Sequence, residues 1–370
     1  MKPKLRFKEF NSNWNTYKFY ELVTIKNGQV NPNDEQYRNL PHIGPGNIEK
    51  ETGRLLEYNL AKDDKLVSSK YLFDKESVIY GKINPHFAKV CYPKFVGLCS
   101  ADAYPINPIK GKITSEFLLY LLLNPQFTKF ATSVSMRTGM PKINRDELSI
   151  YKFTIPEIAE QNKIGNMLTL LDKKIELQSK KIEDLKLFKL CIIKEIFESN
   201  NANTLTKIKD IAKIEKGKQI NGELLLEQGN YYMLNGGINP SGYLNEYNRN
   251  ENTITISEGG NSCGYVSYNK DKFWCGGHCY SVSPNDINNE YLYQLLKYNE
   301  KSIMNLRVGS GLPNIQKKDI ENFCLNIHNN EEQENIATKL SKYDYKIELE
   351  EKYLIKLQEL KKGLMQNMFV

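Results

Sequence analysis

The chain has 370 residues, 40% of them hydrophobic, with 51 basic against 44 acidic residues and a formal net charge of +7. This length permits two domains of ordinary size, and the mild basic excess alone is weak evidence for a polyanionic partner. The longest apolar run, FLLYLLL at 117–123, is too short to cross a bilayer and the N-terminus lacks a signal-peptide pattern, so we expect a cytoplasmic protein outside the membrane.

The chain repeats itself, beginning with its first predicted elements. TYKFYELVTIKNGQ (16–29) aligns with TKIKDIAKIEKGKQ (206–219) at an offset of 189, and both segments are predicted to be amphipathic and stopped by glycine. VIYGKINPHFAKVCY (78–92) aligns with ITISEGGNSCGYVSY (254–268) at an offset of 176. Each of these is predicted to form two strands joined by a polar loop, called here the hairpin loop.

Two predicted helices, 115–123 and 289–296, come next and lead into a repeated turn. RTGMPKI (137–143) reappears as RVGSGLPNI (307–315) at an offset of 172, and we call this segment the proline turn. The falling offset places most of the extra residues of the first copy between Gly28 and Val78. The two copies are therefore expected to share a scaffold and to differ in their loops.

Beyond each proline turn, apolar residues recur in steps of three and four. The seam consists of Leu168, Leu171, Ile175, Ile182 and Leu185 in the first copy, and of Leu340, Ile347, Leu354 and Leu357 in the second. A helix from about 158 to 197 would be about 60 Å long, longer than a domain of this size is wide. We therefore expect the two helices to pack on each other, rather than each covering only its own domain as an amphipathic cap.

The order of the segments predicts the direction of the helices. A domain whose entry and exit lie close together would start the second helix beside the end of the first, which makes the pair antiparallel. Polar residues interrupt the seam at Gln178, Lys189, Glu350 and Lys361. They either fix the register of the pair or mark places where the seam opens toward another protein.

Together these patterns predict an α+β protein, with two pseudo-symmetric globular domains separated by a long antiparallel two-helix coiled coil. The predicted boundaries are 1–155 for the first domain, 156–199 for the first helix, 200–327 for the second domain and 328–370 for the second helix.

Two variable domains, each followed by a proline turn, a strand (FTIPEIAEQNKI, 153–164; FCLNIHNNEEQENI, 323–336) and a long helix, resemble the specificity (S) subunit of a type I restriction-modification system. The resemblance covers essentially the whole chain, although the second copy lacks the proline that matches Pro156. It implies that each domain is a target-recognition domain for half of a bipartite, asymmetric site on double-stranded DNA. The coiled coil would set the gap between the half-sites.

The resemblance also implies partners and a division of labour. The chain would dock two methyltransferase (M) subunits, and restriction (R) subunits would join the complex. S-adenosylmethionine would bind the M subunits, and ATP and Mg the R subunits, so this chain would bind no cofactor and would not be an enzyme. The sequence is consistent with this expectation, because it contains neither a P-loop nor a G-x-G-x-x-G segment. The segment NPHF (84–87) resembles an amino-methyltransferase motif but has histidine in place of the second proline.

The candidate DNA-binding residues lie in the two kinds of repeated loop. In the hairpin loops, lysine can donate to guanine, asparagine can pair with adenine and glutamate can accept from cytosine, although a solvated loop tip is an equal alternative. The proline turns combine a cation with small donors, which suits a phosphate or a partner subunit, or they serve only as tight turns. The candidates are Lys82, Asn84, His86, Lys89, Glu258, Asn261 and Ser262 in the hairpin loops, and Arg137, Thr138, Lys142, Arg307, Ser310 and Asn314 in the proline turns.

The segment WCGGHCY groups Cys275, His278 and Cys279, with Cys263 upstream. The first copy has no equivalent cluster, so we interpret the segment as a buried strand rather than a zinc site. Two other functions remain as alternatives for the whole chain. One is a scaffold that joins two binding modules without DNA, and the other is a stand-alone adenine methyltransferase or nuclease, which would need a cofactor or metal site.

Overall fold

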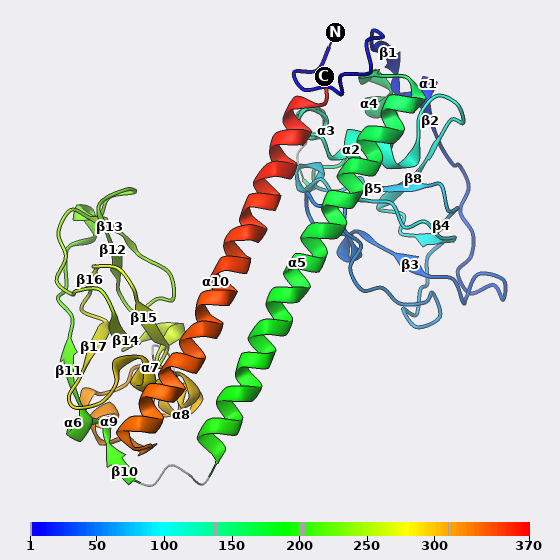
Figure 1. The fold of residues 1–370 in the computed structure, drawn as a ribbon. Helices are drawn as coiled ribbons and strands as arrows, with labels where there is room; N and C mark the ends of the chain where they lie inside the picture. Colours follow the sequence, from blue (N-terminus) through cyan, green and yellow to red (C-terminus); the bar gives the residue numbers. More distant parts are fainter. Residues whose placement is uncertain (1, 137–138, 200–203, 310, 312) are drawn as a thin grey trace. The chain divides into compact units, whose positions relative to one another are not determined.

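The structure is a computed structural model that describes residues 2–136, 139–199, 204–309, 311 and 313–370. The chain divides into two compact units: the first comprises Met1–Ser179 with Tyr353–Val370, and the second comprises Lys180–Lys352. Each unit combines one globular domain with a segment of each of two long helices, which are green and red in Figure 1. Among the described residues, no helix is long and apolar enough to span a membrane.

The first domain contains two β-sheets. The larger has the strand order β2-β8-β5-β6 and the smaller β3-β7-β4, while β1 pairs with β9. The strands are β1 (Asn15–Lys18), β2 (Val23–Ile25), β3 (His42–Ile43), β4 (Tyr71–Phe73), β5 (Val78–Gly81), β6 (Val90–Cys91), β7 (Gly97–Cys99), β8 (Ala103–Pro108) and β9 (Lys152–Ile155). The helical segments are α1 (Phe19–Leu22), η1 (Pro45–Asn47), η2 (Pro85–Phe87), α2 (Ser115–Leu123), α3 (Pro125–Ser135) and α4 (Arg145–Ile150).

The second domain repeats the larger sheet and the pairing of the first strand with the last, whereas its smaller sheet has a different order. Its larger sheet has the order β11-β17-β14-β15 and its smaller sheet β13-β12-β16, while β10 pairs with β18. The strands are β10 (Thr204–Lys207), β11 (Ala212–Lys216), β12 (Tyr231–Leu234), β13 (Gly242–Leu244), β14 (Thr253–Ser257), β15 (Val266–Asn269), β16 (Trp274–Cys275), β17 (Cys279–Pro284) and β18 (Cys324–Ile327). The helical segments are α6 (Ile208–Ile211), η3 (Gly222–Leu224), η4 (Gly260–Ser262), α7 (Asn289–Tyr298), α8 (Glu300–Met304) and α9 (Lys317–Asn322).

The strand register confirms the predicted repeat. Ile79 pairs with Cys91 across the first hairpin, and Thr255 pairs with Ser267 across the second, which are the same positions at the offset of 176. Both larger sheets also place the corresponding strands in the same order. The fold-class prediction of two related α+β domains is therefore confirmed.

The predicted helix at 115–123 is α2, and its apolar run lies in the core of the first domain. The side chain of Thr114 accepts a hydrogen bond from the backbone N of Phe117 at 3.4 Å and so caps the first turn. Phe117 and Leu118 are fully buried in the same core cluster as Val78 of β5. The run is thus long enough for a core helix, and it is too short for a membrane span.

The long helices are α5 (Ile158–Glu198) and α10 (Asn330–Asn367), of 41 and 38 residues. In the first unit, Ile164 and Leu168 of α5 are buried in the domain core, and so are Met365 and Met368 near the end of α10. Phe369, just after α10, completes this core, because its ring stacks on that of Phe117 at 5.3 Å. The first domain thus depends on residues from both helices.

The second unit shows the reciprocal arrangement. Ile192 and Ile193, near the end of α5, are buried with Ile336 and Leu340, near the start of α10, in the core of the second domain. Each long helix therefore packs on a domain as well as on the other helix. The two interpretations of the seam, as a cap and as a coiled coil, each describe part of the packing.

The polar seam residues form matching ion pairs. In the first unit, Lys361 lies 2.6 Å from a carboxylate oxygen of Asp172; in the second, Lys189 lies 2.6 Å from one of Asp344. Adding 172 to Asp172 and Lys189 gives Asp344 and Lys361, so the repeat generates both pairs. A cation and an anion that must meet at one level favour a single alignment of the helices, which supports the register interpretation.

The helices run antiparallel within each unit. In the first unit, Asp172 contacts Lys361, and Lys174 lies over the Tyr353 ring at 5.4 Å, so contacts later in α5 fall earlier in α10. The second unit shows the same trend, because Lys181 pairs with Glu350 at 2.6 Å whereas Lys189 pairs with Asp344. The predicted antiparallel direction is therefore confirmed.

A buried glutamine fixes the corner between the last strand of each domain and its long helix. Gln161 accepts a hydrogen bond from the backbone N of Thr114 at 3.1 Å and donates to the carbonyl of Pro156 at 2.9 Å. The matching Gln333 accepts from the backbone N of Asn288 at 3.2 Å and donates to the carbonyl of His328 at 2.8 Å. The clamp uses a backbone carbonyl, so it persists although histidine replaces proline in the second copy.

Candidate nucleic-acid interface

The hairpin loop and the proline turn form one surface in the first domain. The backbone N of Asn84 donates to the carbonyl of Pro141 at 2.8 Å, and the backbone N of Ile143 donates to the carbonyl of Lys82 at 3.0 Å. Between these bonds, Ile83 and Lys142 make an antiparallel bridge. Two segments almost 60 residues apart in the sequence are therefore joined strand to strand.

The second domain joins its two loops in the same way. The backbone N of Gly260 donates to the carbonyl of Pro313 at 3.0 Å, and that of Ile315 donates to the carbonyl of Glu258 at 2.9 Å. The bridge here lies between Gly259 and Asn314, the positions that match Ile83 and Lys142. The sequence indicated two separate candidate elements in each domain, and the structure makes them neighbours on one framework, called here the joined loops.

The first joined loops hold a group of cations around a buried tyrosine. The Nζ of Lys82 lies 5.2 Å from the centre of the Tyr104 ring, and the Arg145 guanidinium lies 5.5 Å from the same ring. Burial lowers the pKa of Lys82, the charge of Asp102 opposes this shift, and Lys142 and Arg145 reinforce it. A cation that is partly stripped of water in this way suits contact with an anionic or electron-rich group.

The remaining candidates of the first hairpin loop differ in their exposure and in their contacts. His86 is exposed and rests against the Phe87 ring, whereas the ammonium of Lys89 donates to the carbonyl of Pro45. Asn84 is half-buried, and its φ of 49° places it in the left-handed region, which asparagine tolerates better than most residues. Lys142 in the proline turn is exposed. His86 and Lys142 are thus the most accessible of the predicted residues here.

Glu258 in the second domain lies in a polar network. Its Oε1 accepts from Lys216 at 2.5 Å and from the Tyr280 hydroxyl at 2.8 Å, while its Oε2 lies 3.5 Å from Nδ1 of His278. Burial acts to raise the pKa of Glu258, but the hydrogen bonds from Lys216 and Tyr280 outweigh burial and lower that pKa. Only 12% of its side chain is exposed, so the carboxylate is better placed to hold its neighbours than to face a base.

The other predicted residues of the second domain lie at its surface. Asn261, Arg307 and Asn314 are exposed and Ser262 is half-buried. The predicted residues Arg137, Thr138 and Ser310 lie outside the described residues.

A third loop, which follows β2 in the first domain and β11 in the second, adjoins the joined loops and was missed from the sequence. Arg145 donates to the carbonyl of Lys26 at 2.9 Å and also to the side chain of Asn27. In the second domain, Lys216, the last residue of β11 and next to the corresponding loop, reaches Glu258. The sequence did hold a signal for it, because the aligned segments 16–29 and 206–219 both end in exposed polar residues with a glycine.

The cysteine segment is part of the second domain's framework. Cys275 and Cys279 are buried in β16 and β17, and Cys263 donates from its thiol to the carbonyl of Glu258 at 3.1 Å. His278, in contrast, is exposed. Within the described ranges, no three His, Cys, Asp or Glu side chains are grouped so that they could hold a metal ion.

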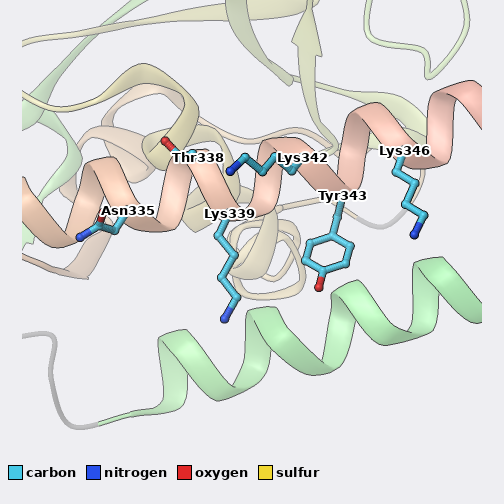
Figure 2. A pocket seen from close by; sticks show the side chains of 6 residues that line it. All are labelled: Asn335, Thr338, Lys339, Lys342, Tyr343 and Lys346. Atoms are coloured by element: carbon cyan, nitrogen blue, oxygen red, sulfur yellow. The ribbon is translucent and has the colours of Figure 1, made fainter.

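An open hollow of about 480 Å³ lies along α10 in the second unit (Figure 2). Its walls are Asn335, Thr338, Lys339, Lys342, Tyr343 and Lys346. In Figure 2, Lys339 and Tyr343 extend toward α5, and the Tyr343 ring lies 5.7 Å from that of Phe188. Side chains of one helix line this open hollow, so it does not enclose a small molecule as an active-site pocket does.

A family profile described as the type I restriction modification DNA specificity domain matches the chain twice, at residues 11–187 and 194–359. The chain therefore belongs to the family of type I restriction-modification specificity subunits. The twofold match corresponds to the internal repeat found in the sequence and in the sheets.

Individual relatives agree with this assignment. The specificity subunit of the type I restriction enzyme EcoDI from Escherichia coli is 37% identical over 153 residues, which cover 41% of this chain and 33% of that protein. A putative type I specificity subunit from Mycoplasma pneumoniae is 34% identical over 155 residues, which cover 40% of this chain and 41% of that protein. Each match thus spans less than half of the relative.

The fold has been seen before. A crystal structure of the S subunit of a type I restriction-modification system from M. genitalium matches 100% of this chain and 99% of that chain, with a TM-score of 0.71 and 19% identity. A structure from work on the assembly and conformational transition of a type I system matches 98% of both chains, with a TM-score of 0.59 and 15% identity. At these identities the likeness concerns the fold.

Proposed function

We propose that this chain is the DNA-reading subunit of a type I restriction-modification complex and that each domain recognises one half of a bipartite, asymmetric site. The observation that carries the proposal is the repetition of the joined loops, which share a backbone framework and present different side chains in the two domains. A common framework suits the regular geometry of the DNA backbone, whereas different side chains suit different bases.

The partners in this proposal are two M subunits, which carry S-adenosylmethionine and methylate adenine, and R subunits, which use ATP and Mg. This chain would itself bind no cofactor and perform no chemistry. Large apolar side chains exposed on the long helices support a docking role, since they are costly to leave in water. They include Leu170 at 67% and Leu187 at 62% exposure on α5, and Ile355 at 54% and Leu360 at 51% on α10.

The decisive experiment maps N6-methyladenine in the genome of cells that carry this gene with its methyltransferase partner. We expect a motif of two short parts separated by a fixed gap. The purified complex should also retain DNA in a strongly salt-dependent way, and the partner alone should not. A complex that ignores DNA would favour the scaffold alternative, whereas methylation by the isolated chain would favour the stand-alone enzyme.

Exchange of residues 1–155 for the corresponding domain of another family member tests the assignment of one half-site to each domain. We expect one half of the methylated motif to change and the other to stay the same. A change in both halves would contradict the modular assignment.

Insertion of a matched heptad into both α5 and α10 tests whether the helices set the gap. The inserted residues preserve the seam, so the helices should still pair. We expect a longer gap between two unchanged half-motifs. An unchanged gap would remove the spacer role while leaving the recognition role intact.

A further inference from the structure

At one place beside the joined loops, a backbone hydrogen bond joins a basic and an acidic residue in both domains. In the first domain, the backbone N of Lys82 donates to the carbonyl of Asp102 at 3.0 Å; in the second, the backbone N of Glu258 donates to the carbonyl of His278 at 2.9 Å. The residues match at the offset of 176. Each pair follows the last pairing of the two central strands, Gly81 with Ala103 and Ser257 with Cys279.

The order of charge is inverted between the two domains. After β5 stands the base Lys82 and before β8 the acid Asp102, whereas after β14 stands the acid Glu258 and before β17 stands His278. A tyrosine supports both pairs from the sheet: Tyr104 lies beneath the ammonium of Lys82, and the Tyr280 hydroxyl donates to Glu258. The backbone hydrogen bond and the supporting tyrosine are therefore the same in both domains, whereas the basic and the acidic residue have exchanged strands.

The exposure of the side chains indicates which member of the second pair faces outward. The His278 side chain is 63% exposed, whereas that of Glu258 is 12% exposed. Oε2 of Glu258 lies 3.5 Å from Nδ1 of His278, and its Oε1 is occupied by Lys216 and Tyr280. The Glu258 carboxylate thus lies beside the imidazole, and the more exposed imidazole is the group that can reach a partner.

We propose that the basic residue of each pair, Lys82 in the first domain and His278 in the second, is a base-contacting residue that determines specificity, and that Asp102 and Glu258 are its positioning residues. This inference rests on the proposed function of the two domains. The Lys82 ammonium and an imidazole N–H of His278 can each donate to guanine O6 or N7 in the major groove. Neighbouring strands lie about 4.8 Å apart, and successive bases of one DNA strand about 3.4 Å. The inversion therefore moves the donor far enough to address a different base step in each half-site.

The first test compares Lys82→Gln with His278→Asn in the complex with the methyltransferase partner. The substrates are duplexes in which each base pair of the mapped motif is changed in turn, and the readout is the relative methylation rate. Each variant should lose on the order of tenfold to a hundredfold discrimination at one position. The position should lie in one half-site for Lys82→Gln and in the other for His278→Asn. Lys82→Arg, which keeps the donor, should retain the preference of the parent protein.

The controls are Lys94→Gln and Lys213→Gln. These two basic residues lie on the same domains as Lys82 and His278, their side chains are 52% and 67% exposed, and they lie outside the joined loops. Both variants should keep the full base preference. A loss of preference in these controls would show that the assay responds to net charge, and it would overturn the assignment to Lys82 and His278.

The positioning residues are tested by Glu258→Gln and Asp102→Asn. Each should reduce discrimination at the same base pair as the variant of its basic partner, and by less, because the basic side chain remains. A merely structural role would instead lower methylation on every duplex by the same factor. Thermal melting of each variant alongside the parent protein identifies any variant that is unfolded. If Lys82→Gln is unfolded, the first domain is tested with Lys82→Arg and Asp102→Asn instead.

Three results would overturn the inference. They are an unchanged preference in both variants, a change in the same half-site for both, and a uniform loss on all duplexes in folded protein. Failure of the proposed function would look different, because the parent complex would then show no two-part preference at all.

Discussion

The two units share their framework and differ at the corner where each long helix begins. In the first unit, the carboxylate of Glu160 is fully buried, accepts from Nε and Nη2 of Arg6 at 2.7 Å each, and accepts from Trp14 at 3.3 Å. In the second unit, the matching Glu332 has a buried Oε2 without a hydrogen-bond partner among the residues described. The glutamine clamp and the interhelix ion pair are present in both units, so both units need these contacts. The surroundings of the matching glutamates, Glu160 and Glu332, differ between the units.

The largest difference is expected from removing the charge of the two matching glutamates. Glu160→Gln leaves the Arg6 guanidinium, whose side chain is 12% exposed, without its counter-charge, and should cost the first unit about 3 kcal/mol. Glu332→Gln should change the second unit by less than about 1 kcal/mol, because among the described residues no ion pair of Glu332 is found. Urea unfolding followed by the fluorescence of Trp14, in a Trp274→Phe background, measures the first effect. An equal loss of unfolding free energy in the two variants would contradict the proposed difference between the units.

The glutamine clamps should come next. Gln161→Ala removes three hydrogen bonds, including one donated to the carbonyl of Lys112 at 2.9 Å, and Gln333→Ala removes two. Both side chains are buried, so each loss leaves backbone groups unpaired and should cost about 2 kcal/mol, with the larger loss at Gln161. Hydrogen exchange at the backbone N of Thr114 and of Asn288 reports each clamp separately. Unchanged protection at both amides would show that the clamp is not needed.

The interhelix ion pairs should have smaller effects, since their carboxylates are 29% and 36% exposed. Lys189→Met and Lys361→Met should each cost about 1 kcal/mol. The loss at Lys361 should be larger, because its ammonium also donates to the carbonyl of Thr52 at 2.9 Å. The exchange Asp172→Lys with Lys361→Asp should recover most of the stability lost in Lys361→Asp alone. Failure to recover would show that the pair does not fix the register.

The smallest effect is expected from pH at the second corner. Burial lowers the pKa of His328 below 6.5, and the charge of Glu332 and a backbone contact only partly oppose this. The unfolded chain therefore takes up the proton first, so the stability of the second unit is complete above pH 6.5 and falls as the pH drops toward the lower folded-state pKa. His328→Gln should remove this dependence in urea unfolding between pH 7.5 and 5.5, whereas an unchanged dependence would assign it to other groups.

The sequence predicted the parts of the fold that depend on repetition and periodicity. The seam of α5 and α10 keeps its steps of three and four for its whole length, and the register of both hairpins follows from one offset. These signals are local, or are copied within the chain, so one sequence is enough to reveal them. The partners of the polar seam residues were harder, since Asp172 and Asp344 stand in the sequence as ordinary helical acids until their distance to a lysine of the other helix is known.

The candidate site was less predictable, because it depends on which loops meet. The hairpin loops and proline turns were recognised as repeated, yet their direct joining through Ile83 with Lys142 and Gly259 with Asn314 required the structure. Glu258 looked like a free acceptor in the sequence, and its three partners come from β11, β17 and the loop before β17. Asp102 and His278 were not singled out as readers, because their relation to Lys82 and Glu258 exists only across neighbouring strands.

The two-helix origin of the first core has a consequence for synthesis on the ribosome. Leu168 is made roughly 200 residues before Met365, Met368 and Phe369, which share its buried cluster. At about 5 to 20 residues per second, the nascent first domain waits on the order of ten to forty seconds for these side chains. Until then the ring of Phe117 lacks its stacking partner, so a chaperone that covers this apolar surface would protect the nascent domain.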